Sequence, residues 1–182
     1  MASVLLHRDS EPGPETGNCA IVVLYEDNSS RDAAIRLCNS LEKIFHSEID
    51  FEITWCRFKY FNDPAVAREA AEIAAGADLL IVAIQRPEEL PLEVQVWFER
   101  WLQHRKSSEG ALVLLRTSES TIPAISQNPY LYLLAQRANF DFISLSNTNS
   151  FSTERIPEYL KSTRPPDSTR NSEHYSRFGI NE

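Results

Sequence analysis

Three short, nearly continuous apolar runs constrain the fold more than any other feature of this chain. They read AIVVLY (20–25), LLIVAI (79–84) and ALVLLR (111–116). A strand covered on both faces is apolar at almost every position, whereas a strand with one face in water alternates apolar and polar residues. We therefore expect these runs to be the central strands of a parallel sheet.

Two further segments alternate instead. In FEITWCRF (51–58) the large apolar residues occupy every second position, and FDFISL (140–145) has a similar alternation. Alternation is typical of strands that are covered less completely. We expect these segments to be the two edge strands.

Helical patterns lie between the expected strands. After a cap at Asn28 or Ser29, apolar residues recur at the spacing of an amphipathic helix as far as Phe45. Residues typical of helix starts follow later, at Asp63–Pro64, Pro91 and Asn128–Pro129. Gly76 is expected to end the second helix. Strands that alternate with helices predict an α/β fold, here a single open, mostly parallel five-stranded sheet with helices on both faces.

The length of 182 residues favours one domain with an extension at each end. Residues 1–18 lack apolar periodicity, so we expect a disordered leader. Residues 147–182 are rich in Ser, Thr, Asn and Pro, which predicts a flexible polar C-terminal tail. The segment between them, 19–146, is the expected folded domain.

The charge argues against one class of partner. The formal net charge is -8 at pH 7, whereas nucleic-acid-binding domains normally present a basic face. No segment approaches the length of a membrane span. The cysteines (Cys19, Cys38 and Cys56) lack the close CxxC spacing of zinc sites. We therefore expect a cytoplasmic protein with free thiols, and no nucleic-acid or membrane partner.

Polar residues that follow the strands are candidates for a site, because ligands of parallel α/β sheets gather at the carboxyl ends of the strands. Glu26 and Asp27 follow the first strand and supply the oxygen ligands that Mg²⁺ prefers, although acidic pairs in loops are also commonly solvated or capping. Their loop lacks the glycines of a phosphate-binding turn. Basic residues near the other strand ends leave an anionic ligand open as an alternative: Arg57, Lys59, Arg86 and Arg116.

The stretch ADLLIVAIQRPEELP (77–91) resembles the third strand and following turn of response-regulator receiver domains. Asp78 matches the first acidic position of that pattern and Pro87 matches its turn proline. Ala83 falls where the family has its phosphate-accepting aspartate. The resemblance implies a flavodoxin-like sheet with the strand order 2-1-3-4-5.

The same resemblance assigns roles to residues elsewhere in the chain. It implies that Glu26 and Asp27 occupy the Mg²⁺-binding positions, and that Thr117 or its neighbour Ser118 lies near the position of the family's hydroxyl residue. In ANFDFISLS (138–146), Asp141 and Phe142 match the family, but Leu145 replaces its lysine and Ser146 its proline.

The two replacements at Ala83 and Leu145 remove groups that phosphoryl transfer to an aspartate requires. Phosphoryl transfer to an aspartate needs that carboxylate as nucleophile, a metal to offset charge and a cation to hold the product. Ala83 supplies no nucleophile and Leu145 no charge. The resemblance therefore implies a degenerate pocket at Ala83, Thr117 and Leu145 that is not phosphorylated at the usual position.

Aromatic and apolar side chains supply candidate contact surfaces. Trp97 and Trp101 lie on one stripe of the third expected helix, and interfaces favour aromatic residues close to arginine. A protein partner or a second copy of the chain is the expected occupant. Tyr175, Phe178 and Ile180 form an apolar island in a polar tail, a layout typical of a docking peptide.

Taken together, these features favour a non-enzymatic signalling or adaptor domain that acts through protein contacts, with a kinase or regulator as the class of partner. We expect no catalytic residues and no required cofactor, since no Ser-His-Asp or Cys-His arrangement falls at the strand ends. Two alternatives stay open. One is a flavodoxin-like small-ligand sensor or enzyme that uses the strand-end pocket, and the other is a structural subunit of a complex.

Overall fold

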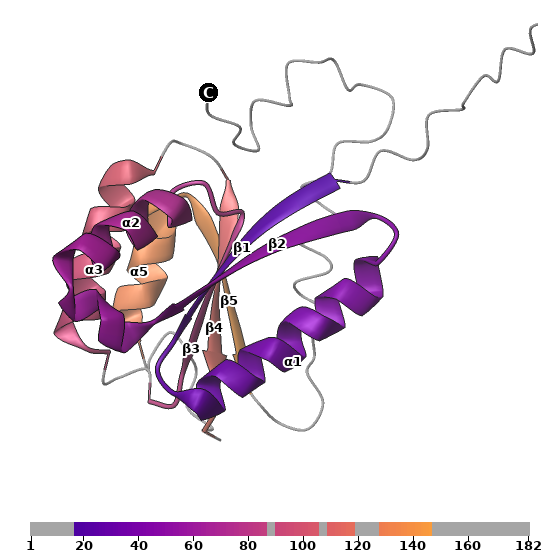
Figure 1. Cartoon of the computed structure of the whole chain (residues 1–182), viewed down its shortest axis with the longest axis horizontal. Helices are drawn as coiled ribbons and strands as arrows, with labels where there is room; N and C mark the ends of the chain where they lie inside the picture. The colour runs from indigo at the N-terminus through magenta and orange to yellow at the C-terminus, as the bar shows by residue number, and fades with distance from the viewer. Residues whose placement is uncertain (1–16, 87–89, 106–108, 119–127, 147–182) are drawn as a thin grey trace, which may run out of the picture.

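One parallel sheet forms the centre of the protein (Figure 1). The computed structural model describes residues 17–86, 90–105, 109–118 and 128–146. The strands are β1 (Gly17–Tyr25), β2 (Ile49–Arg57), β3 (Leu79–Ile84), β4 (Gly110–Arg116) and β5 (Phe140–Ser146). Their order is β2-β1-β3-β4-β5, and every neighbouring pair is parallel. The predicted fold class and strand order are confirmed.

Helices cover both faces of this sheet. Figure 1 shows α1 (Asn28–Phe45) on one face and α2 (Pro64–Ala74), α3 (Leu92–His104) and α5 (Pro129–Arg137) on the other. Asp63 and Asn128 cap α2 and α5 as predicted. The N-cap of α1 is Asp27, one residue earlier than expected. None of the helices in the described ranges is both long enough and apolar enough to cross a membrane.

Four strands differ from the predicted limits, and β4 and β5 are each one residue longer than expected. β1 begins at Gly17, within the predicted leader, because its first residues pair with the start of β2 at Ile49. β2 begins two residues earlier than expected and ends at Arg57. The rest of the leader and the whole predicted tail, with Tyr175, Phe178 and Ile180, lie outside the described residues, as does Pro87.

A short 3-10 helix, η1 (Phe58–Asn62), follows β2 and explains the aromatic run RFKYF. One strand face cannot bury Phe58, Tyr60 and Phe61 together, because strand side chains alternate between two faces. The 3-10 turn buries Phe58 and Phe61 and leaves Tyr60 exposed. The expected extension of the strand to Phe58 is therefore wrong by one residue.

The apolar core has two halves, one on each side of the sheet. The half beneath α1 is largely aliphatic, and the half beneath α2, α3 and α5, which we call the aromatic half, adds six buried aromatic side chains to its aliphatic ones. In the aromatic half, the ring of Trp97 stacks on Phe61 at 4.9 Å between centroids and on Trp101 at 6.4 Å. These rings fix α3 against η1 and leave its opposite stripe facing outward.

Candidate functional site

The carboxyl ends of β1 and β3 meet where the strand order reverses, which is the usual ligand crevice of such sheets. Glu26, directly after β1, donates its backbone N–H to the carbonyl oxygen of Ala83 at 3.2 Å. Its Oε2 atom accepts the backbone N–H of Gln85 at 3.0 Å. The hydroxyl of Ser118, beyond β4, donates to the carbonyl oxygen of Gln85. The protein's own groups thus bridge the crevice from both sides.

Asp27 caps the first turn of α1. Its Oδ1 atom accepts the backbone N–H of Ser30 at 2.8 Å, and the Ser30 hydroxyl oxygen accepts the backbone N–H of Asp27 at 2.9 Å. This reciprocal capping box satisfies helix donors that have no intrahelical partner. Each of the two predicted metal ligands therefore has a carboxylate oxygen bonded to backbone. No group of three or more His, Cys, Asp or Glu suited to a metal occurs among the residues that the structure describes.

The residues of the predicted degenerate pocket belong mostly to the core. Ala83 lies in register between Tyr25 of β1 and Leu115 of β4, and its side chain is 0% exposed. Leu145 is buried in the same apolar cluster beneath α1. Thr117 donates its backbone N–H to the carbonyl oxygen of Ile84 at 3.2 Å, and its buried hydroxyl has no hydrogen-bond partner in the described residues. The structure thus places two buried apolar side chains where the receiver resemblance implies an acid and a lysine.

Two of the basic residues near the strand ends, Arg57 and Arg116, lie on strands whose side chains alternate in opposite phase at these positions. Side chains of a strand alternate between the faces of the sheet. Arg57 is in phase with Ile53 and Trp55, which pack on the α1 side, whereas Arg116 is in phase with Leu114 on the opposite side. These two guanidinium groups leave the sheet on opposite faces. A shared anion site between them is not supported.

The thiols are free, as predicted, and are poorly suited to nucleophilic chemistry. Burial raises the pKa of Cys56 to about 11. Burial, with a smaller contribution from the Asp78 carboxylate, raises the pKa of Cys19 to about 12, and Cys38 is shifted to about 12 by burial and by Glu42. Because the thiolate is the reactive form, these side chains are largely inert near neutral pH.

The tryptophans predicted as contact residues of α3 face the core. Trp97 and Trp101 are 1% and 0% exposed, so they are core residues and the prediction that they meet a partner is not met. The outward stripe of α3 instead carries Leu92 and Val96, which are 71% and 53% exposed. The buried stripe of α3 consists of Val94, Trp97, Phe98 and Trp101. Helical periodicity would therefore have predicted that Leu92 and Val96 lie on the exposed stripe.

A groove of about 370 Å³ runs along this stripe, between α3 and the start of α2. Buried Phe61 and Trp97 form its floor and exposed Leu92 and Val96 one wall, with Glu93 and Arg100 on its rim. We call it the α3 groove. It joins residues from η1, α2 and α3, and sequence reasoning missed it because its floor and its wall come from different elements.

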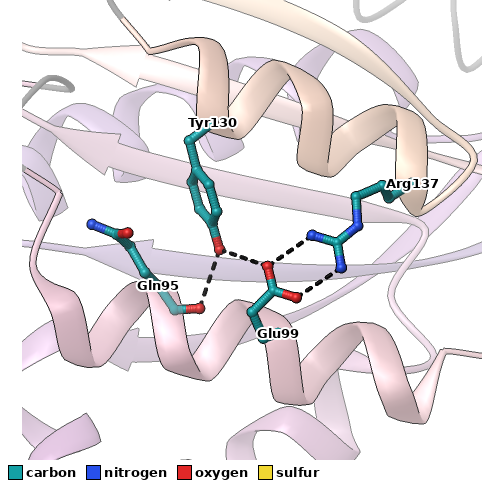
Figure 2. A network of polar contacts seen from close by, with 4 residues as sticks. All are labelled: Gln95, Glu99, Tyr130 and Arg137. Atoms are coloured by element: carbon teal, nitrogen blue, oxygen red, sulfur yellow. Dashed lines mark hydrogen bonds and ion pairs between the residues drawn. The ribbon is translucent and has the colours of Figure 1, made fainter.

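A polar network holds α3 to α5 (Figure 2). Glu99 receives two parallel hydrogen bonds from Arg137, at 2.8 and 2.7 Å. The Tyr130 hydroxyl lies 3.3 Å from Glu99 Oε1 and 3.1 Å from the carbonyl oxygen of Gln95. Hydrogen bonding from Arg137 lowers the pKa of Glu99, and burial together with Glu99 raises the pKa of Tyr130 to about 12. The network joins residues 38 positions apart.

We expect Glu99→Gln to weaken this attachment in a pH-dependent way. A carboxylate whose pKa is lowered in the folded state stabilises that state above its unfolded pKa, and the contribution is lost as pH falls through the folded value. Urea unfolding should therefore show the variant slightly less stable than wild type at pH 7, with the difference vanishing in acid. The effect is small because both side chains of the ion pair are about half exposed. Glu69→Gln, on the exposed face of α2, is the control, and an equal pH-dependent loss there would contradict the assignment to Arg137.

Comparison of the sequence with models of known protein families found no match, and comparison with curated proteins found none either.

Proposed function

We propose that this protein is a non-enzymatic signalling or adaptor module with a receiver-like sheet, which acts through protein contacts and is not switched by phosphorylation of an aspartate. The observation that carries the proposal is Ala83. A buried methyl group stands at the carboxyl end of the central strand β3, where a phosphate acceptor would need a carboxylate.

The surroundings of Ala83 support the same interpretation. The Glu26 carboxylate accepts the backbone N–H of Gln85, and the Asp27 carboxylate accepts a backbone N–H in the first turn of α1. Leu145 fills the apolar cluster where the resemblance implies a cation. Phosphoryl transfer depends on preorganised charge at the reacting group. A site in which the acids serve as backbone acceptors and the neighbours are aliphatic lacks that preorganisation.

Contact with other proteins is the function that the described surface favours. Leu92 and Val96 are exposed side by side on one helix, one turn apart, above an aromatic floor. Exposed apolar side chains grouped in a groove mark interaction sites more often than isolated ones do. The Tyr175, Phe178 and Ile180 island outside the described residues is the second proposed contact, and a kinase or regulator is the proposed class of partner.

Affinity capture by the full-length protein tests the proposal, with bound proteins identified by mass spectrometry. The bait is used with and without Mg²⁺ and acetyl phosphate, beside a variant with Tyr175, Phe178 and Ile180 replaced by serine. We expect a specific partner that the wild type retains under both conditions and the serine variant loses. Intact-mass measurement of the bait should show no added phosphate. A phosphorylated bait, or no specific partner with a melting temperature raised by Mg²⁺ or a nucleotide, would instead favour the small-ligand alternative.

A further inference from the structure

The α3 groove exposes apolar surface that the described part of the chain does not cover. Leu92 and Val96 lie on the wall and are mostly exposed, while Trp97 on the floor is 1% exposed. The indole N–H of Trp97 is buried and has no hydrogen-bond partner in the described ranges. Covering such a surface with another apolar face is favourable roughly in proportion to the area removed from water.

One acidic and one basic residue of α3 flank this apolar surface. Glu93 and Arg100 are seven positions apart on α3, which is two helical turns or about 10 Å. Val96 lies between them along the helix, and all three residues line the groove. Neither Glu93 nor Arg100 has an ion-pair partner among the described residues. An apolar centre is thus flanked by one free acid and one free base.

We propose that a second copy of this chain occupies the groove, with the two α3 helices packed antiparallel about a two-fold axis near Val96. Antiparallel packing reverses the order of charges along the partner helix, so Glu93 faces Arg100 of the partner subunit and Arg100 faces the partner's Glu93. At the centre Val96 meets the partner's Val96, and Leu92 lies over the aliphatic stem of the partner's Arg100. The same patch serves both subunits, as a two-fold interface requires.

The charge pattern is what favours a second copy over an unrelated protein. A helix face with an acid three positions before an apolar residue and a base four positions after it is close to complementary to itself when reversed. Any other partner would have to present the same spacing independently. The helix pair is small beside the roughly 800 Å² per partner of a standard interface, so we expect a reversible dimer with micromolar affinity.

Charge reversal on the full-length protein gives a test specific to this arrangement, with sedimentation velocity over a concentration series as the measurement. Glu93→Arg places arginine against arginine at both ends of the interface, and Arg100→Glu places glutamate against glutamate. Each variant alone should associate at least about tenfold more weakly than wild type. An equimolar mixture of the two should recover the dimer, because each mixed pair has opposite charges at both ends.

Two further variants separate the interface from general effects of charge. Glu69→Arg, on the exposed face of α2, changes the net charge by the same amount as Glu93→Arg and should leave the dimer intact. Val96→Asp places two carboxylates together at the axis and should give a monomer whose circular dichroism and melting temperature match those of wild type.

A wild-type protein that stays monomeric throughout the series overturns the proposal and leaves the groove to a different protein. A dimer that survives Val96→Asp, or a mixture of the two charge variants that fails to associate, overturns it as well. A dimer through the groove leaves the tail island of Tyr175, Phe178 and Ile180 as the contact with a different protein. The proposed function keeps its own test, the capture of that protein through the island and the absence of phosphate on the bait.

Discussion

Trp101→Ala should lower the free energy of unfolding by about 3–5 kcal/mol, as truncation of a large buried aromatic side chain usually does. Trp101 is 0% exposed and packs edge to face on Phe140, with ring centroids 5.6 Å apart. Its indole N–H donates to the carbonyl oxygen of Ala74 at 2.9 Å, which ties α3 to the end of α2. Chemical denaturation followed by far-UV circular dichroism measures the loss, and a cost below about 1 kcal/mol would show that this part of the core is not tightly packed.

The neighbouring tryptophan supplies a matched control for the hydrogen bond. Trp97 is one helical turn away and equally buried, but its indole N–H has no partner in the described residues. Phenylalanine removes the N–H at either site while keeping an aromatic ring. We therefore expect Trp101→Phe to cost about 1 kcal/mol more than Trp97→Phe, which is the usual net value of one hydrogen bond. Equal costs would mean that the bond to Ala74 contributes nothing.

The strands and helix starts were predictable because each depends on the types of a few neighbouring residues. A strand buried on both faces must be apolar throughout, so LLIVAI marked β3 at its observed limits. Asp63 and Asn128, each followed by a proline, marked helix starts because the aspartate or asparagine accepts first-turn N–H groups and proline tolerates the first position.

Contacts between distant residues were not predictable in the same way. The bond from Gln85 to Glu26 spans 59 positions, and nothing in the local sequence of Glu26 distinguishes a free metal ligand from a carboxylate bonded to backbone. The burial of the α3 tryptophans was not predicted, for a different reason. Aromatic residues are enriched both in cores and at interfaces, so residue type alone did not decide the face, whereas the helical phase of Trp97 and Trp101 with Val94 did.

Gly110→Ala should be strongly destabilising for the addition of a single methyl group. A methyl group at position 110 would overlap the ring of Phe140. That ring has little room to move, because Trp101 packs on it and the guanidinium of Arg105 lies 4.2 Å from its centroid. Overpacking of this kind costs about 1–3 kcal/mol. Thermal and urea unfolding of the variant and the wild type give the value.

Two comparisons identify the ring of Phe140 as the cause. Gly76→Ala adds the same methyl group where no atom lies within 4 Å, so we expect no loss and a gain of up to about 1 kcal/mol from a less flexible unfolded chain. Phe140→Leu removes the edge of the ring that the new methyl group meets. In a double-mutant cycle, the cost of Gly110→Ala should be smaller in the Phe140→Leu background than in wild type. Additive costs would mean that the backbone at Gly110, and not the ring, requires glycine. That result would move the cause from side-chain packing between β4 and β5 to the conformation of the first residue of β4.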